Sequence, residues 1–369
     1  MLIQLDRIQR PTLLADETIC RANIAWMAGK ARKLGVKFRP HFKTHQSRQI
    51  GRWFRDENVS AITVSSVSMA RYFIDDGWED ITIAFPLNLR ESYDIIELSG
   101  KADLNILVTM AGPLEIFGRQ LNGVHKPIGV FIKIDTGYHR TGLAMSENEK
   151  IERIINTCRK HSSLTFKGFL THTGHTYNAR GINEIEMISR EAFRQLQSLK
   201  KKFSSGSGEL MLSVGDTPAC SLIDDFDGMD EIRPGNFVFY DVMQTMIGSC
   251  TANRIAICLA CPVVSKDPSR KEIVVYGGAV HLSKESVFYM GKTIFGIVSS
   301  LSPEGWSEPL EDCYVSSLSQ EHGLIKVSSA VFGNLNPGDL LGILPVHSCL
   351  TSQCMGNYLI NGTLPEPHM

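Results

Sequence analysis

The residues of this chain that could do chemistry are gathered in five polar segments. These segments are 39–45, 133–142, 171–177, 213–218 and 233–236. They include a lysine at position 43, two histidine-containing loops, and glycines beside hydroxyl and amide side chains. A lysine amine can condense with a carbonyl group, and backbone N–H groups freed by glycine can hold a phosphate. The set therefore suggests a phosphorylated carbonyl cofactor held as a Schiff base.

A scaffold must bring these segments to one face. Between about residues 10 and 241, apolar runs alternate with helical patterns. Helices are expected at 16–34, 146–161 and 183–203, the first capped by Asp16 and ended by Gly35. Strands are expected at 36–38, 61–64, 81–85, 104–108, 128–134, 166–170, 209–214 and 237–240.

Eight strands alternating with helices predict an α/β fold, a closed (β/α)8 TIM-like barrel. An open doubly wound sheet is the alternative, but no G-x-G-x-x-G follows the first strand. In a barrel, functional side chains collect at the carboxyl ends of the strands, and the loops near strands 7 and 8 often bind phosphate. The barrel therefore accounts for four segments that follow strands and for 233–236, which precedes the strand expected at 237–240.

The last third of the chain has a different pattern. Strands are expected at 254–264, 272–277, 293–298, 313–317, 324–327 and 340–344, with turn signals such as Asn336-Pro337-Gly338-Asp339 between them. We predict two domains: the barrel over 10–244, and a mainly β domain over 245–369, with 1–9 as an optional addition.

Composition excludes some classes of partner. The 369 residues carry 38 Lys and Arg against 39 Asp and Glu, so the net charge of −1 gives no support for binding nucleic acid or a membrane surface. No apolar signal segment or membrane-spanning run is seen. Nine scattered cysteines are an odd number, which favours free thiols and a reducing, cytoplasmic location.

The motifs resemble those of a known family. Pro-His-Phe-Lys-Thr-His at 40–45 and Lys-Ile-Asp-Thr-Gly-Tyr-His-Arg-Thr-Gly at 133–142 are similar to fold-type III pyridoxal 5'-phosphate (PLP) enzymes, which join an alanine-racemase-like barrel to a β domain. Within that group the chain resembles the D-threonine aldolase and D-serine dehydratase family. Supporting segments lie at 276–284, 319–323 and 345–349, and the resemblance runs from about residue 12 to 351.

The resemblance implies roles for individual residues. Lys43 would carry PLP, with His172 beside the cofactor ring and Arg140 near its phenolic oxygen. Either Arg233 or Tyr177 would face the pyridine nitrogen, leaving it unprotonated and the ring a weaker electron sink. His322 would be a further catalytic residue. The phosphate would be held by Gly215, Thr217, Gly235 and Asn236, with a hydroxyl added by Tyr240.

A metal is also expected. His347 and Cys349 are two zinc-type ligands one residue apart, so both can face one side of an extended segment. Alone, such a pair is more often a buried thiol beside a surface imidazole. The resemblance implies a divalent metal there, acting as a Lewis acid on the substrate's 3-hydroxyl. The thiolate favours zinc, with manganese or magnesium as alternatives. Cys258 and Cys261 lie in an apolar run and are interpreted as core.

The predicted function is a PLP- and metal-dependent lyase that dehydrates D-3-hydroxy amino acids such as D-serine or D-threonine to a 2-oxo acid and ammonia. Retro-aldol cleavage of the D-threonine aldolase type, giving glycine and an aldehyde, is the alternative. An amino-acid racemase is a second alternative, but its reaction would not use the His-x-Cys pair. A PLP-binding homeostasis protein is disfavoured, because such proteins resemble the barrel alone and lack the β domain. The family implies a homodimer in which His322, His347 and Cys349 reach the partner's cofactor.

Overall fold

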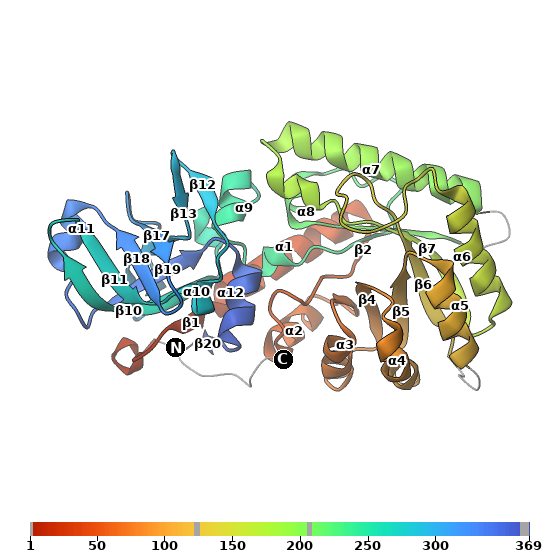
Figure 1. The fold of residues 1–369 in the computed structure, drawn as a ribbon, viewed down its shortest axis with the longest axis horizontal. Coiled ribbons are helices and arrows are strands. Elements are labelled where there is room, and N and C mark those ends of the chain that lie inside the picture. The colour runs from red at the N-terminus through yellow and green to blue at the C-terminus, as the bar shows by residue number, and fades with distance from the viewer. Residues whose placement is uncertain (1–2, 122–125, 205–208, 362–368) are drawn as a thin grey trace. The chain divides into compact units, whose positions relative to one another are not determined.

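The computed structural model describes residues 3–121, 126–204, 209–361 and 369 (Figure 1). The chain divides into two compact parts. The barrel part is Trp26–Gly235, and the β part combines Met1–Ala25 with Asn236–Met369. Helix α1 (Glu17–Leu34) crosses the boundary, and its first turn is capped by Asp16, whose Oδ1 accepts from Ile19 N at 2.9 Å.

Eight parallel strands form the barrel part, in the order β2-β9-β8-β7-β6-β5-β4-β3. The two ends of this sheet meet at a parallel bridge between His41 and Thr63, where Phe42 N donates to Thr63 O at 2.9 Å. The predicted TIM-like barrel is therefore confirmed. The strands are β2 (Lys37–Phe38), β3 (Ala61–Val64), β4 (Asp80–Pro86), β5 (Asp103–Val108), β6 (Ile128–Lys133), β7 (Leu164–Leu170), β8 (Met211–Val214) and β9 (Glu231–Ile232).

The eighth strand corrects the sequence prediction. It is β9, Glu231–Ile232, whereas the run expected at 237–240 begins in a 3₁₀ helix, η4 (Asn236–Val238). All four side chains of that run are fully buried, and a short buried apolar run fits a turn as well as a strand. Segment 233–236 therefore follows the eighth strand instead of preceding it.

Helices surround the barrel strands, as Figure 1 shows for α3, α4, α5 and α6. The helices of this part after α1 are α2 (Arg48–Arg55), α3 (Val67–Ile74), α4 (Ser92–Ser99), α5 (Ala111–Gln120), α6 (Asn148–Lys160), α7 (Ile182–Phe203) and α8 (Thr217–Leu222). Short 3₁₀ helices lie at η2 (Leu89–Glu91) and η3 (Gly174–Asn178). Leu107, Phe131 and Leu170 from three neighbouring strands pack together as a core cluster.

An eight-stranded sheet forms the β part, ordered β11-β18-β17-β14-β19-β10-β1-β20. The long strand β10 also pairs with β11, so six antiparallel strands close into a ring. Its strands are β1 (Thr12–Ala15), β10 (Ile257–Asp267), β11 (Glu272–Tyr276), β14 (Gly296–Ser299), β17 (Tyr314–Leu318), β18 (His322–Lys326), β19 (Leu340–Pro345) and β20 (Leu359–Ile360).

Smaller elements complete the β part. The hairpins are β12 (Val287–Tyr289) with β13 (Lys292–Ile294), and β15 (Leu301–Ser302) with β16 (Gly305–Trp306). The helices are α9 (Val242–Ile247), α10 (Ala279–Leu282), α11 (Ser329–Asn334) and α12 (Ser348–Met355), with 3₁₀ turns η1 (Leu5–Arg7) and η5 (Ala252–Arg254). The mainly β character expected for this region is confirmed.

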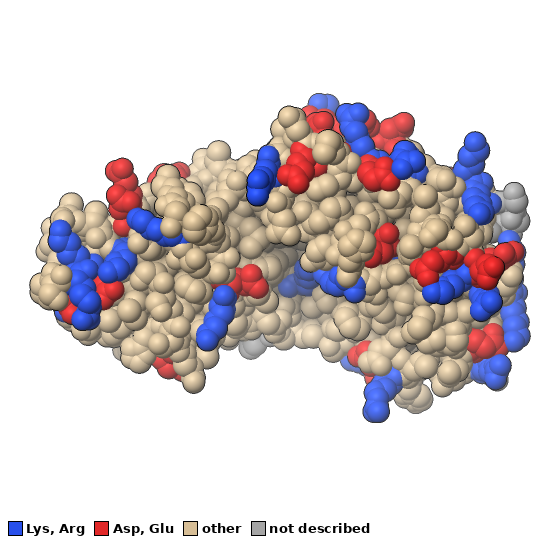
Figure 2. Space-filling view, turned by 45° about the horizontal axis from the view of Figure 1, so that its top comes forward, with Lys and Arg blue, Asp and Glu red and all other residues tan. Residues whose placement is uncertain are grey.

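Acidic and basic side chains are interspersed on the face drawn in Figure 2, in keeping with the near-neutral net charge. Among the described residues, no helix combines the length and apolar character that crossing a membrane would require.

Candidate functional site

Lys43 lies in a turn just beyond β2, at the carboxyl-end face of the barrel. The preceding residue, Phe42, is fully buried, with its ring centroid 4.9 Å from those of Phe54 and Phe73 and 5.0 Å from that of Trp78. Lys43 itself is exposed. The packing of Phe42 in the core fixes the position of the turn, and the Lys43 side chain projects from it toward solvent.

A buried polar network joins strands β8 and β9. Ser213 Oγ donates to Glu231 at 2.6 Å and accepts from Arg233 Nε at 2.6 Å. Arg233 also donates through Nη2 to the carbonyl of Thr171. Arg39 forms a buried ion pair with Glu231, and its Nε lies 2.7 Å from Oε2. These bonds fix the Arg233 guanidinium, which is only 4% exposed.

The segments after β8 and β9 are those in which a phosphate cradle is predicted. Gly215 has φ +152°, and a Cβ there would lie 2.5 Å from Arg233 N. A Cβ on Gly235 would lie 2.9 Å from His41 O. The hydroxyl of Thr217 is fully buried and finds no hydrogen-bond partner among the described residues. Two close backbone approaches and one unsatisfied buried hydroxyl fit an anion held by backbone N–H groups and a threonine.

Two histidines lie within this cluster of positive charge. His172 Nδ1 donates to Gly215 O at 2.8 Å, since a carbonyl can only accept. Burial lowers the pKa of His172 well below its ordinary value, and the charges of Lys43, Lys133 and Arg140 lower it further. Burial and the charges of Lys43 and Arg233 likewise lower the pKa of His41. The structure thus brings Lys43, Arg140, His172 and Arg233 into one electrostatic neighbourhood.

Lys133 is a member of this neighbourhood that sequence reasoning missed as a site residue. It is the last residue of β6 and is 5% exposed. Burial, with the charges of Arg233 and Arg140, lowers its pKa to about 7. The sequence signal that could have identified Lys133 is its position as a charged residue at the end of an otherwise apolar strand.

Aromatic side chains flank His172. Its ring centroid lies 5.8 Å from that of Tyr138 and 6.5 Å from that of Tyr177. The Arg140 guanidinium lies 5.1 Å from the centre of the Tyr138 ring. Tyr177, in η3, is therefore near His172, and Arg233 is bonded to the carbonyl of Thr171, the residue before His172.

Asn236 and Tyr240 belong to the β part. Asn236 donates through Nδ2 to Asp241 at 2.6 Å and to Ser348 Oγ at 2.9 Å. Its side-chain nitrogen is therefore committed, and its backbone N–H, at the start of η4, is what it can offer a phosphate. Tyr240 is fully buried, with φ +49°, and the Arg254 guanidinium lies 5.0 Å from its ring centre.

His347 and Cys349 lie at the start of α12, just after β19. Burial lowers the pKa of His347, but hydrogen bonding to Cys349 and the negative charges of Cys349, Asp241 and Glu285 outweigh it and raise that pKa to about 9. An imidazole and a sulfur in anionic surroundings fit a divalent cation. No group of three or more His, Cys, Asp or Glu suited to a metal occurs among the described residues, so this pair would need further ligands from water or substrate.

The other residues singled out from the sequence also lie in the β part. His322 is exposed at the start of β18, opposite Tyr276 of β11. His281 accepts through Nδ1 from Gly278 N at 3.1 Å, and its Nε2 lies 3.9 Å from Glu321. Cys258 and Cys261 are fully buried in β10, and burial raises the pKa of both thiols.

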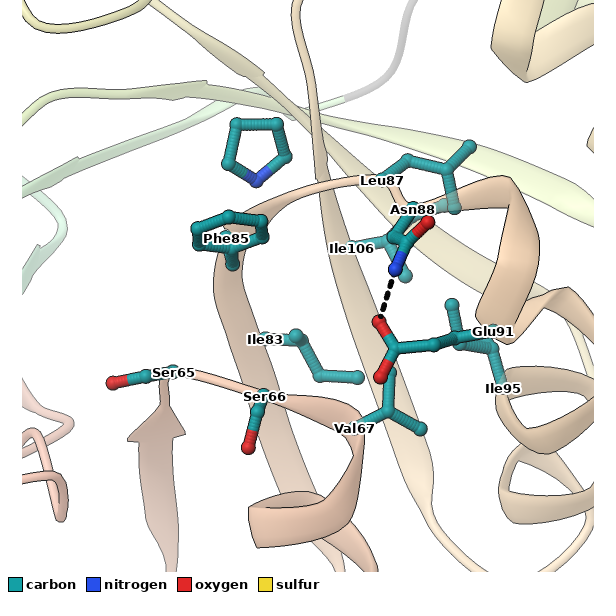
Figure 3. Close-up of a pocket in the computed structure, with 11 residues that line it drawn as sticks. Ser65, Ser66, Val67, Ile83, Phe85, Leu87, Asn88, Glu91, Ile95 and Ile106 are labelled. Carbon is teal, nitrogen blue, oxygen red and sulfur yellow. Dashed lines mark hydrogen bonds between the residues drawn. The ribbon is translucent and has the colours of Figure 1, made fainter.

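A separate pocket of about 260 Å³ lies between α3 and η2 (Figure 3). Its lining is mainly apolar, and Asn88 donates to Glu91 at 2.9 Å on one side. None of the predicted site residues lines this pocket. The candidate site therefore rests on the strand-end residues and not on this cavity.

Comparisons with known proteins cover nearly the whole chain. Residues 16–242 match the family model described as the alanine racemase N-terminal domain, and residues 256–361 match the putative serine dehydratase domain. The chain is 29% identical to D-serine dehydratase from Dictyostelium discoideum, over 99% of this chain and 98% of that protein. It is 28% identical to D-threo-3-hydroxyaspartate dehydratase from Delftia sp. (strain HT23), over 95% and 90%. D-threonine aldolase from Arthrobacter sp is more distant, at 23% identity over 64% and 62%.

Solved structures show the same fold. D-threo-3-hydroxyaspartate dehydratase from Delftia sp. HT23 superposes with a TM-score of 0.90 at 24% identity, covering 100% of this chain and 99% of that chain. A cysteine-to-alanine mutant of a D-threo-3-hydroxyaspartate dehydratase, described as the metal-free form, superposes equally well, with a TM-score of 0.90.

Proposed function

Because the chain belongs to the alanine racemase-like family of fold-type III PLP enzymes, we propose that it is a PLP- and divalent-metal-dependent lyase. Its reaction is the dehydration of a D-3-hydroxy amino acid of the D-serine or D-threonine kind to a 2-oxo acid and ammonia. The observation that carries this proposal is the pairing of two motifs in one chain: a cationic phosphate cradle beside Lys43, and the His347–Cys349 pair in anionic surroundings.

Both PLP and a divalent metal fit the residues that are present. The unsatisfied Thr217 hydroxyl and the close approaches at Gly215 and Gly235 suit a phosphate. The imidazole and sulfur of His347 and Cys349 suit zinc, with manganese or magnesium as alternatives. When bound, PLP supplies an electron sink for charge at Cα, and the metal supplies a Lewis acid for the 3-hydroxyl.

The barrel residues have binding and proton-holding roles in this proposal. Lys43 anchors the cofactor and is the amine that accepts the proton from Cα. His172, its Nδ1–H held by Gly215 O and its pKa lowered, stays neutral beside the cofactor ring. Arg140 neutralises negative charge at the phenolic oxygen.

Arg233 is the favoured partner of the pyridine nitrogen, with Tyr177 the competing candidate. Burial lowers the pKa of Arg233 to about 10, so the guanidinium is still charged at neutral pH. A permanent cation at that position would disfavour protonation of the pyridine nitrogen and would make the ring a weaker electron sink.

His347 and Cys349 hold the metal, and His322, exposed on β18, is the further catalytic residue of the β part. Asn236 and Tyr240 complete the phosphate side. We also propose the domain division 10–244 and 245–369, with 1–9 as an optional addition to the second domain. We further propose a homodimer whose active sites are shared through the β domains, and a cytoplasmic location. The nine cysteines, all without a disulfide, support a reducing compartment.

Product analysis tests the proposal. Purified protein reconstituted with PLP and zinc is given D-serine, D-threonine or D-threo-3-hydroxyaspartate, each with and without a chelator. We expect formation of a 2-oxo acid and ammonia from the D-amino acids. The chelator should abolish turnover, and L-serine should not be turned over. Glycine and an aldehyde would establish the aldolase alternative. Formation of L-serine, unaffected by the chelator, would establish a racemase.

A further inference from the structure

A buried carboxylate lies behind the His347–Cys349 pair, at Asp241. Its side chain is completely buried. One oxygen, Oδ1, accepts from Gln244 N at 2.9 Å and caps α9. The helix cap uses only this oxygen and leaves Oδ2 available for other donors.

The second oxygen binds the residue between the two proposed metal ligands. Asp241 Oδ2 accepts from Ser348 N at 3.0 Å and from Ser348 Oγ at 3.2 Å. It also accepts from Asn236 Nδ2 at 2.6 Å. The same Asn236 nitrogen lies 2.9 Å from Ser348 Oγ and 3.7 Å from Cys349 Sγ. One oxygen therefore ties residue 236 to the turn at 347–349.

A second link holds α9 to the same turn. Met243, one residue into the helix, donates from its backbone to Val346 O at 3.3 Å. The turn is thus held on both sides of His347. Bonds to an ionised acceptor are short and strong, so a carboxylate in this position restricts the turn more than a neutral acceptor could.

We infer that Asp241 is a positioning residue that fixes Asn236 and the His347–Cys349 pair as a single unit within the β part. The inference rests on the proposed function for the identity of the metal and the cofactor. Asp241 acts through Asn236 and Ser348, to which it is bonded directly. Its expected effect is to hold the donors in place before the metal and the cofactor bind.

The test replaces the carboxylate by its amide. Asp241→Asn preserves size and capping ability, because asparagine is a good N-cap residue. With its amide oxygen on Gln244 N–H, the NH₂ group faces the donors on Asn236 and Ser348, so those bonds are lost while the cap is kept. Asp16→Asn is the matched control: it makes the same chemical change at the cap of α1, where Oδ1 accepts from Ile19 N.

Two binding constants are measured on the full chain: zinc affinity by competition with a chromogenic chelator, and PLP affinity by absorbance titration of cofactor-free protein. We expect Asp241→Asn to weaken zinc binding about 10- to 100-fold, the usual effect of losing an outer-shell partner. PLP binding should weaken several-fold, and Asp16→Asn should change neither constant. Thermal unfolding of both variants separates a loss of stability from a loss of binding, and Asp241→Ser, which keeps the cap alone, should repeat the binding defect.

Zinc or PLP affinity of Asp241→Asn within twofold of the parent would overturn the inference. That result leaves the proposed function intact if the parent still binds zinc and forms a 2-oxo acid. If the Cys349→Ala variant binds zinc as tightly as the parent does, Cys349 is not a metal ligand. Both proposals would then fail together.

Discussion

The two parts of the molecule place their histidines in opposite electrostatic surroundings. In the barrel part, burial and the charges of lysines and arginines lower the pKa of His41 and His172. In the β part, Cys349, Asp241 and Glu285 raise the pKa of His347 to about 9 despite burial. The pKa of the same residue type is lowered in one part and raised in the other, because the sign of the neighbouring charges differs.

This difference indicates which ligand each part is built to accept. A buried cluster of cations is costly unless an anion joins it, and an anionic pocket around a histidine and a thiol invites a cation. The barrel part therefore suits phosphate and carboxylate groups, and the β part suits a divalent metal. The following four changes test the contrast, beginning with the largest expected effect.

Lys43→Ala removes the proposed covalent anchor from the cationic cluster. Turnover should fall by about 10²–10⁴-fold or more, the range for removal of a positioned proton-transfer group. PLP should still bind through its phosphate, but borohydride should no longer fix it to the protein. Lys101→Ala, at an exposed residue in the turn between α4 and β5, is the control. Peptide mapping that finds the pyridoxyl group on Lys133 in the parent would contradict this assignment.

Cys349→Ala removes the softer ligand from the anionic site. Loss of Lewis-acid assistance should cost several kcal/mol, a rate loss of roughly 10²–10³-fold at tenfold per ~1.4 kcal/mol. The cofactor spectrum should be unchanged, because the barrel residues hold PLP. Cys354→Ala, an exposed thiol in the same helix, should keep both metal and turnover. Full turnover by a metal-free Cys349→Ala protein would show that the pair is structural.

Lys133→Met tests the cost of packing cations together. The pKa of Lys133 is lowered from 10.5 to about 7, so between these values the unfolded chain binds more protons than the folded protein. Stability should therefore rise with pH across that window and be lowest below it, by up to a few kcal/mol at 1.36 kcal/mol per pKa unit. Lys133→Met should remove this slope.

The measurement for Lys133 is the free energy of unfolding of cofactor-free protein at about pH 6 and about pH 9. The variant should be more stable than the parent at both pH values, and the difference should be smaller at the higher pH, because about pH 9 lies inside the window over which the parent gains stability. Lys101→Met should reproduce the parent's slope. An identical slope in Lys133→Met would mean that the buried amine is not the group responsible.

Thr217→Val has the smallest expected effect. The buried hydroxyl has no partner among the described residues, so its removal should not destabilise cofactor-free protein. PLP affinity should fall by about tenfold, because a hydrogen bond to a charged group contributes roughly 1.5 kcal/mol or more. Thr217→Ser should retain the parent's affinity. Unchanged PLP binding in the valine variant would place the phosphate elsewhere.

Local patterns determined much of the fold. Strand β3 occupies the expected 61–64, and helix α1 begins directly after the predicted cap at Asp16. Both depend on interactions within a few residues: side-chain periodicity in the strand, and a carboxylate bonded to the next turn in the helix. The alternation of such elements was enough to predict the barrel and the β domain.

Tertiary structure alone decided the eighth barrel strand. An acidic residue in a two-residue strand carries no strand signal, and Glu231 is completely buried only because Arg39, 192 positions earlier, lies 2.7 Å from it. The same holds for β1, which joins the sheet of the β part by pairing with β10. Partners so distant in sequence leave no local pattern.

For the site, the sequence by itself determined which residue types stand at the strand ends and that a His-x-Cys pair lies near the carboxyl end of the chain. It did not determine their electrostatics. The lowered pKa of Lys133 arises from burial beside Arg140 and Arg233, and the ordered turn at His347 depends on Asp241, more than a hundred residues earlier. Burial and the charge of neighbours are properties of the folded chain, because only folding brings those groups out of water and into contact.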